Sequence, residues 1–362
     1  MKVGIVTFHF VNNFGGALQT YALSEIVSDL NKEKTIIIDY RHWFIRFTDF
    51  VRIFPITTNV KEILSGLTTF KERRGRIKKF QKFSDDYFST SSIYTSEKKL
   101  NQNPPQCDKF ICGSDQIWNP SITLGASAPY YLNFVQDKNK KISYAASFGV
   151  SEINKKYHSD IVKYLEQFKA ISVREKEGVG LVNKISGIDA ECLIDPTFLL
   201  TKEQWIQMSE KPKNKEPYIL VYMMQKNDRV YEYARKIKEL LNIKIIDISR
   251  YGFKKDFVDE VCIDIGPKEF VGLFNNASYI CTNSFHGLAF SLILEKKFFI
   301  VPSTRFNSRI GNLLDLFNLE LIEDINKDVV EKESYDKEKV RKIIDKEREK
   351  SIAFLKQNLF ND

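Results

Sequence analysis

The stretch KVGIVTFHFVNNFGGALQTYALSEIVSDLNKEKTIIIDY, residues 2–40, decides the fold that we expect for this chain. It opens with a short apolar run and passes through a turn with two adjacent glycines. It then continues with apolar residues at helical spacing: Leu18, Tyr21, Ala22, Ile26 and Leu30. A second apolar run, KTIIIDY (34–40), follows. Strand, glycine-bearing loop, helix and strand in this order are the usual start of a doubly wound sheet.

The same alternation recurs along the rest of the chain. Four apolar runs end in polar or glycine-bearing residues: KFICGSDQIWN (109–119), KKISYAASFGV (140–150), KAISVREKEGVGLV (169–182) and AECLIDPTFLL (190–200). A second set follows a charged segment: YILVYMM (218–224), IKIIDIS (243–249), YICTNS (279–284) and FFIVPS (298–303). The pattern predicts an α/β protein with two Rossmann-like domains that face each other across a cleft.

The length of 362 residues also favours two domains, because a single hydrophobic core usually stops growing below this size. We expect an N-terminal Rossmann-like domain over residues 1–210, with a basic and aromatic helical insertion at 41–100. A C-terminal Rossmann-like domain is expected over 211–334, and a highly charged C-terminal helix over 335–362.

Composition narrows the classes of function. The formal charge of +8 favours partners that carry phosphate or carboxylate, but the absence of any zinc-finger, helix-turn-helix or RNA-recognition signature argues against nucleic acid. The five cysteines are scattered and form no CxxC pair, which argues for reduced thiols and against structural zinc. With neither a signal peptide nor a run of about 18 apolar residues, we expect a cytoplasmic protein that binds no metal.

Residues 41–83 combine aromatic and basic side chains. RHWFIRFTDFVRIF (41–54) mixes aromatics with arginine, and FKERRGRIKKFQKF (70–83) is densely basic. Two interpretations are open. The segment is either a solvated helical insertion packed on the sheet, or a surface that meets an anionic membrane or a lipid diphosphate.

The stretch ICTNSFHGLAFSLIL (280–294) places four polar side chains directly after a predicted strand: Thr282, Asn283, Ser284 and His286. Gly287 then opens an apolar helix. A histidine at a helix N-terminus is favoured in its neutral form, and the helix dipole there attracts an anionic substrate. A lone histidine is more often structural than catalytic, but this position makes His286 an acid/base candidate.

Two further loops carry candidate residues. In NNFGGALQ (12–19), backbone N–H groups can approach a ligand at a helix N-terminus, although a tight turn alone also explains the glycines. The residues that we expect to serve the loop or bind the acceptor are Asn13, Gly15, Gly16 and Gln19. Asn13 either caps the helix or contacts substrate. Asp115, in GSDQIWN (113–119), is either a helix cap or a general base.

Arginines follow two of the predicted strands. Arg174, in SVREKEG (172–178), is placed to hold a carboxylate or phosphate bidentately, or to form an ion pair with Glu175 or Glu177. Arg305 and Arg309 lie just beyond the run at 298–303 and are either anion ligands or ordinary surface arginines.

Taken in order, NNFGGALQTYAL, CGSDQIWN, SYAASFG, SVREKEG, DPTFLL and NSFHGLAFSLIL resemble the motifs of the polysaccharide pyruvyl transferase family. The resemblance runs from residue 1 to about residue 318. It implies the GT-B arrangement of two Rossmann-type domains, with donor binding in the second. It also implies a transferase that moves pyruvate from phosphoenolpyruvate onto two hydroxyls of a sugar, as a cyclic ketal. The acceptor belongs to a polysaccharide or lipid-linked precursor, as in exopolysaccharide or capsule synthesis, and no metal or nucleotide cofactor is expected.

The same resemblance implies roles for individual residues. His286 matches the family's HG histidine and is the acid/base candidate, and Arg174 matches the arginine of the family's SxR motif. Asp115, chosen from its position in the loop, is the second catalytic candidate. The expected donor-binding set is Arg174, Asn283, Ser284, Gly287, Arg305 and Arg309. Several characterised relatives carry arginine where this chain has Ser284, so the donor pocket is either rebuilt around the three arginines or takes a different donor.

Three hypotheses follow. The first is a pyruvyl transferase acting on a lipid-linked sugar at the inner face of the cytoplasmic membrane. The second is a glycosyltransferase of the same fold that uses a nucleotide sugar. The third is a non-catalytic carbohydrate-binding or assembly protein.

Overall fold

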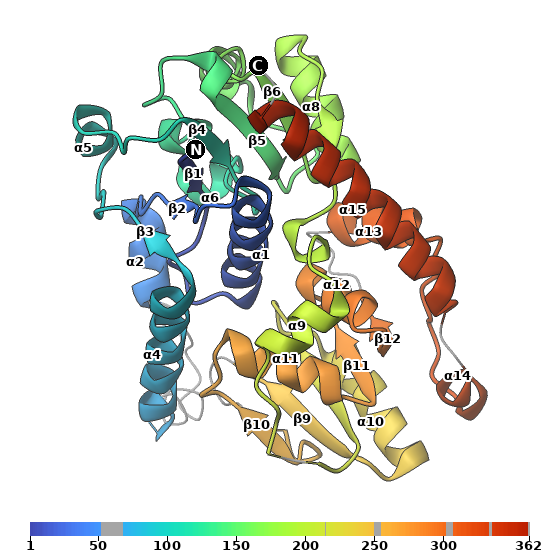
Figure 1. Ribbon diagram of the computed structural model, residues 1–362. Helices are drawn as coiled ribbons and strands as arrows, with labels where there is room; N and C mark the ends of the chain where they lie inside the picture. The colour runs from blue at the N-terminus through green and yellow to red at the C-terminus, as the bar shows by residue number, and fades with distance from the viewer. Residues whose placement is uncertain (52–67, 214, 250–254, 302–306, 333–334, 361–362) are drawn as a thin grey trace. The chain divides into compact units, whose positions relative to one another are not determined.

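The computed structural model describes residues 1–51, 68–213, 215–249, 255–301, 307–332 and 335–360 (Figure 1). Contacts divide the chain into two compact units. Unit 1 comprises the described residues within 1–51, 82–200 and 344–362, and unit 2 comprises those within 52–81 and 201–343. Two long helices, α4 (Phe70–Tyr87) and α15 (Lys337–Phe360), contribute residues to both units.

Unit 1 is built on a seven-stranded parallel sheet with the order β3-β2-β1-β4-β5-β6-β7. Strands β1 and β5 are buried along their whole length, as expected for a parallel sheet covered on both faces. The strand bounds are β1 Val3–Val6, β2 Ile36–Ile37, β3 Ser89–Thr90, β4 Lys109–Cys112, β5 Lys141–Ala146, β6 Ala170–Val173 and β7 Glu191–Cys192.

Helices and short 3-10 turns connect these strands. The α-helices are α1 Phe14–Asn31, α2 Trp43–Val51, α5 Glu97–Gln102, α6 Pro120–Thr123, α7 His158–Leu165 and α8 Lys176–Ser186. The 3-10 helices are Ala128–Tyr131, Lys138–Lys140, Lys155–Tyr157 and Pro196–Phe198. Helix α8 ends at Gly187, whose φ of 72° lies in the left-handed region that favours glycine. Of the insertion expected at 41–100, residues 52–67 lie outside the described residues, and the remainder contains α2, α4, β3 and α5.

Unit 2 has a five-stranded parallel sheet with the order β10-β9-β8-β11-β12. Its strands are β8 Tyr218–Tyr222, β9 Lys244–Ile248, β10 Glu260–Cys262, β11 Tyr279–Thr282 and β12 Lys297–Ile300. Its helices are α9 Lys202–Met208, α10 Asp228–Leu241, α11 Pro267–Asn276, α12 Phe285–Ile293, α13 Asn307–Phe317 and α14 Lys327–Glu331. The prediction of an α/β chain with two Rossmann-like parallel sheets is confirmed.

The strand order gives each sheet one topological switch point. In unit 1 the chain runs outward from β1 on one side and from β4 on the other, so the switch lies between β1 and β4. In unit 2 it lies between β8 and β11. Open α/β sheets bind ligands beyond the carboxyl ends of the strands at such points. The loops after β1 and β4, and those after β8 and β11, are therefore where functional residues are expected.

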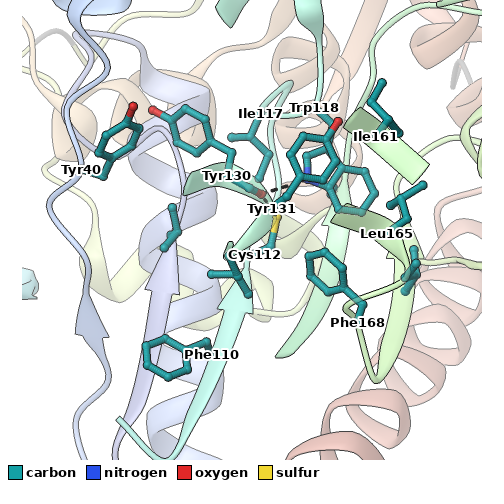
Figure 2. Packing of buried hydrophobic residues seen from close by; sticks show 14 of the residues in the cluster. Tyr40, Phe110, Cys112, Ile117, Trp118, Tyr130, Tyr131, Ile161, Leu165 and Phe168 are labelled. Atoms are coloured by element: carbon teal, nitrogen blue, oxygen red, sulfur yellow. Dashed lines mark hydrogen bonds between the residues drawn. The ribbon is translucent and has the colours of Figure 1, made fainter. Parts of the chain in front are cut away.

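The core of unit 1 anchors one of these loops. Trp118, at the end of the loop after β4, is 1% exposed and stacks on Tyr131 with ring centroids 5.0 Å apart and an interplanar angle of 3°. Its indole N–H donates to the carbonyl oxygen of Tyr130 at 3.0 Å, as Figure 2 shows. Burying a large aromatic side chain stabilises by roughly 1.5–3 kcal/mol, so the loop that carries Asp115 is tied to the domain core at this end.

Candidate active site

The switch point of unit 2 is held together by Asn283. Its Oδ1 accepts a hydrogen bond from the backbone N–H of Met224 at 3.0 Å, and its Nδ2 donates to the carbonyl oxygen of Gln225 at 2.7 Å. Both partners lie in the loop after β8, the strand that pairs with β11. Asn283 therefore ties the two loops of the switch point to each other.

Helix α12 begins in close contact with the end of β11. The hydroxyl of Thr282 donates to the carbonyl oxygen of Tyr222 at 2.6 Å and accepts from the backbone N–H of Ser284 at 3.1 Å. A Cβ at position 287 would overlap this hydroxyl, so only glycine fits there without a shift. Gly287 thus sets how closely the first turn of α12 packs against the sheet.

His286 lies in the first turn of α12, where the sequence predicted a helix N-terminus. Its ring packs edge-on against Phe285 with centroids 5.1 Å apart, and the residue is 9% exposed. Ser284 occupies the N-cap position, but its side chain makes no capping hydrogen bond. The first-turn N–H groups of α12 are thus not capped by this hydroxyl, and they carry the positive end of the helix dipole.

The two arginines expected beyond β12 differ in what the structure describes. Arg309 lies in α13, which packs against α12, and it is partly buried. Arg305 lies outside the described residues. Whether either of them binds a donor anion stays a prediction.

In unit 1, the loop before α1 is shaped by Asn13 and Gly16. The side chain of Asn13 caps α1, accepting from the backbone N–H of Gly15 at 2.9 Å and of Gly16 at 3.4 Å. A Cβ at Gly16 would lie 2.9 Å from the carbonyl oxygen of Phe8 and 3.5 Å from Oδ2 of Asp115. The missing side chain therefore lets the helix start approach the loop after β1, while the loop after β4 lies at an ordinary contact distance.

Gln19 is fully buried beneath this loop. Its Nε2 donates to Oγ1 of Thr7 at 2.9 Å and to the carbonyl oxygen of Gly16 at 3.0 Å. These contacts fix the first turns of α1 against the end of β1. Acceptor binding by Gln19 and by the other loop residues stays a prediction.

Asp115 has an unusual backbone conformation. Its φ of 79° lies in the left-handed region, which costs a non-glycine residue roughly 1–3 kcal/mol and often marks a functional site. Its carbonyl oxygen accepts from the N–H groups of Ile117 at 2.8 Å and Ser147 at 3.0 Å. Its Oδ1 accepts from the N–H of Gln116 at 2.8 Å, and the residue is partly exposed. The carboxylate is thus available at the switch point of unit 1.

Arg174 is buried in an ion cluster with Glu175 and Asp195. Its Nη1 donates to Oδ2 of Asp195 at 2.8 Å, and its Nε lies 3.5 Å from Oε1 of Glu175. Burial alone would lower the pKa of Arg174, but the carboxylates of Glu175, Asp195 and Asp115 raise it. The ion pair with Glu175 that the sequence left open is present. The sequence analysis did not identify Asp195 as a partner of Arg174.

A second buried carboxylate of unit 1, that of Asp39, was also missed. His9 follows β1 and Asp39 follows β2, and His9 Nε2 lies 3.1 Å from Asp39 Oδ1. Arg41 donates to both carboxylate oxygens of Asp39, at 2.7 Å each. Burial alone would raise the pKa of Asp39, but the hydrogen bonds from His9 and Arg41 outweigh it and lower the pKa to about 2. The sequence signal that could have found this contact is that polar residues directly follow two neighbouring parallel strands.

The candidate residues fall into two sets, one in each unit. Unit 1 holds Asn13, Gly15, Gly16, Gln19, Asp115 and Arg174, and unit 2 holds Asn283, Ser284, His286, Gly287 and Arg309. In the part of the chain that the structure describes, no group of three or more His, Cys, Asp or Glu side chains is placed to hold a metal ion.

Comparison with known proteins gives a family and a fold. The family model described as polysaccharide pyruvyl transferase matches residues 13–304. Among solved structures, S. aureus MnaA with UDP has a TM-score of 0.51 and 11% identity, covering 100% of this chain and 97% of that one. UDP-GlcNAc 2-epimerase from Neisseria meningitidis bound to UDP-GlcNAc has a TM-score of 0.50 and 10% identity, covering 100% of both chains. At such identities the likeness shows the fold alone, which is GT-B-like as predicted. A search of curated proteins finds no match.

Proposed function

Because the chain belongs to the polysaccharide pyruvyl transferase family, we propose that it transfers pyruvate from phosphoenolpyruvate to a sugar of a polysaccharide or lipid-linked oligosaccharide precursor. The product is a cyclic pyruvate ketal, and phosphate is released. The observation that supports this chemistry best is the position of His286, in the first turn of a helix that begins at the switch point of unit 2.

The reaction forms two C–O bonds at C2 of the donor and breaks the C2–O bond to phosphate. Protonation of the methylene carbon makes C2 electrophilic, and the first sugar hydroxyl adds there as it loses its proton. Phosphate then leaves and the second hydroxyl adds to the same carbon. The two protons lost by the hydroxyls balance the one gained by the methylene carbon and the one gained by phosphate. Such steps need a positioned acid and a positioned base.

We assign the acid to His286 and the hydroxyl base to Asp115. The N-terminus of α12 is the proposed site for the donor's anionic groups, since helix N-termini bind phosphate and carboxylate. Arg309 on the adjacent α13 adds a cation to the same unit, and Arg305 is proposed to add another. Together these groups replace the arginine that several relatives carry at the position of Ser284. The proposed mechanism uses no metal or nucleotide cofactor.

The test is phosphate release from phosphoenolpyruvate with a panel of synthetic or lipid-linked galactosides, glucosides and mannosides. The His286→Ala variant should lose turnover by about 10²–10⁴-fold, the usual contribution of an acid/base. His158→Ala is the matched control, because His158 also begins a helix, α7, but that helix follows β5 and a ring nitrogen of His158 is hydrogen-bonded to the carbonyl oxygen of Ile153 at 3.0 Å. Equal turnover of wild type and His286→Ala would remove the assigned role.

A nucleotide-sugar glycosyltransferase is the second candidate, since one solved structure named above contains UDP and the other contains UDP-GlcNAc. A fold shared at 10–11% identity does not select the donor. Thermal stabilisation does, because a ligand at a hundredfold its Kd adds roughly 2.7 kcal/mol to the stability of the protein that binds it. Stabilisation by UDP-sugars and none by phosphoenolpyruvate would favour the second candidate.

A lipid-linked acceptor would also require contact with a membrane. Helix α2 exposes Trp43 and Phe47, at 62% and 58%, one turn apart, with the exposed Arg46 between them. Aromatic and cationic side chains on one helix are typical of interfacial anchors. In the described part of the chain, no helix is long and apolar enough to cross a bilayer. We propose that the protein is cytoplasmic and that α2 touches an anionic membrane peripherally.

Flotation with anionic liposomes tests this contact. We expect the protein to bind the liposomes in a salt-sensitive way, and we expect the double variant Trp43→Ser/Phe47→Ser to bind them more weakly. Binding that is absent, or that the double variant retains in full, would leave α2 without a role at the membrane.

A further inference from the structure

The loop that carries Asp115 is backed by a buried ion cluster, defined as Arg174, Glu175 and Asp195. The side chains of Arg174, Asp195 and Glu175 are 2%, 0% and 5% exposed. One guanidinium thus lies between two carboxylates, all within unit 1. A buried cluster of this kind rigidifies whatever its members hold, because each group needs the others as partners.

Each carboxylate of the ion cluster holds a serine beside Asp115. The hydroxyl of Ser114, the residue before Asp115, donates to Oδ2 of Asp195 at 3.1 Å. The hydroxyl of Ser147 donates to Oε1 of Glu175. The backbone N–H of Ser147 in turn donates to the carbonyl oxygen of Asp115 at 3.0 Å. The left-handed conformation of Asp115 is therefore held through both serines.

The ion cluster is poorly suited to bind the donor directly. Arg174 already faces two carboxylates, so the three side chains together carry one net negative charge. An anionic donor would have to compete with Asp195 for a guanidinium that is almost completely buried. The attraction that a free guanidinium offers to phosphate or carboxylate is therefore already used.

We propose that the ion cluster is a positioning device for Asp115, through Ser114 and Ser147, and that Arg174 acts there and does not contact the donor. The inference rests on the proposed function, in which Asp115 takes the proton of the acceptor hydroxyl. A displacement of about 1 Å at a reacting group can cost a hundredfold in rate. Loosening the loop should thus impair the acceptor step and leave donor binding intact.

The first test uses Ser114→Ala and Ser147→Ala, which each remove one hydroxyl and no charge. The matched control is Ser24→Ala, because Ser24 is a buried serine of the same unit whose hydroxyl lies 2.5 Å from Thr35 Oγ1, in a hydrogen bond away from the loop. We expect kcat/KM for the acceptor to fall at least about tenfold in the two loop variants, with the donor KM within about twofold of wild type. The control should match wild type in both.

Hydrogen exchange gives a readout that does not need activity. The backbone N–H of Trp118 donates to the carbonyl oxygen of Ser147 at 3.2 Å, so the peptide over residues 113–119 should exchange faster in both loop variants and not in Ser24→Ala. Unchanged exchange and unchanged acceptor kinetics would overturn the proposal. If the wild type releases no phosphate from phosphoenolpyruvate, the proposed function fails, and the exchange rates alone still decide whether the ion cluster holds the loop.

Arg174→Lys separates the two roles of this arginine. A positioning role predicts faster exchange of the 113–119 peptide and a lower kcat, with the donor KM within about twofold of wild type. A donor-binding role predicts a donor KM raised at least about tenfold with unchanged exchange, because lysine cannot replace a bidentate contact. The second result would refute the proposal.

Discussion

Replacing Gly287 by alanine tests whether His286 is positioned by the close approach of α12 to β11. The added Cβ would overlap Thr282 Oγ1 and would lie 3.0 Å from both Cβ and Cγ2 of Thr282. Real Cβ contacts almost never fall below 3.0 Å and nine in ten exceed 3.4 Å. Either the start of α12 or the side chain of Thr282 must therefore move.

Thr282 is not free to rotate away. It is fully buried, and its hydroxyl joins the carbonyl oxygen of Tyr222 to the N–H of Ser284. Losing both hydrogen bonds costs about 1–3 kcal/mol, which is also the usual cost of overpacking a core. Alanine regains up to about 1 kcal/mol from its better helix propensity. The free energy of unfolding should fall by roughly 1–2 kcal/mol, and Tm by about 2–8 °C for a unit of this size.

The assay is thermal unfolding followed by circular dichroism, with Gly311→Ala as the control. Gly311 lies in α13 of the same unit, and a Cβ there would meet no atom within 4 Å. That control should be neutral or gain up to about 1 kcal/mol. If Gly287→Ala unfolded at the temperature of Gly311→Ala, the contact between Gly287 and Thr282 would not constrain α12, and the reasoning from close approach would be refuted. The same variant should lose transferase turnover, because the first turn of α12 carries His286.

Three further outcomes are expected. The pKa of Asp39 is lowered to about 2, so its ionised carboxylate stabilises the fold above about pH 4. Roughly 2 kcal/mol of the free energy of unfolding should be lost as pH falls from 4 to 2. In acid unfolding curves, Asp39→Asn should lack this dependence. Burial raises the pKa of Asp247 to about 6 despite the hydrogen bond from Tyr231. The free energy of unfolding should therefore fall by about 3 kcal/mol as pH rises from 4 to 6. If Asp247→Asn shows no such pH dependence, Asp247 is its source. The Ser284 hydroxyl makes no capping hydrogen bond, whereas Asn227 caps α10. Ser284→Ala should therefore lower the free energy of unfolding by well under the roughly 1 kcal/mol expected for Asn227→Ala, and it should weaken phosphoenolpyruvate binding in calorimetry. Equal losses of stability in the two variants would contradict this.

The fold was readable from the sequence because its signals are local. Most of the strands lie in short apolar runs that end in polar or glycine residues, and the helices between them have their own periodicity. The exceptions among the described strands are β3 (Ser89–Thr90) and β10 (Glu260–Cys262), which are short and partly polar and were not predicted. A helix beginning at Gly287 was predicted from such local signals, and α12 begins two residues earlier, at Phe285. Capping of α1 by Asn13 was one of two alternatives that the sequence left open, and the structure shows the cap. The functional loops follow from these elements, since a polar loop after a parallel strand lies at the carboxyl edge of the sheet.

The missed parts of the site depend on which strands become neighbours. Arg174 and Asp195 are 21 residues apart in sequence and meet because β6 pairs with β7. His9 and Asp39 are 30 residues apart and meet because β1 pairs with β2. Single-sequence patterns give each strand but not its neighbour, so the partner of a buried charge was out of reach. For Arg174 the sequence left open an anion ligand or an ion pair with Glu175 or Glu177, and it did not name Asp195 as a partner.

The distribution of charge bears on which unit receives which substrate. At its switch point unit 1 presents Asp115, backed by an ion cluster with one net negative charge. Negative charge disfavours an anion such as phosphoenolpyruvate. It suits a neutral sugar whose hydroxyl must give up a proton to a base. Unit 2 presents the N-terminus of α12, whose first turn carries His286, with Arg309 on the neighbouring helix. A helix N-terminus with a cation nearby is a favourable environment for phosphate and carboxylate. If Arg174 bound the donor, this separation of charge would fail, since the anion would sit among three carboxylates. This difference in charge is the basis on which we propose donor binding in unit 2 and acceptor activation in unit 1.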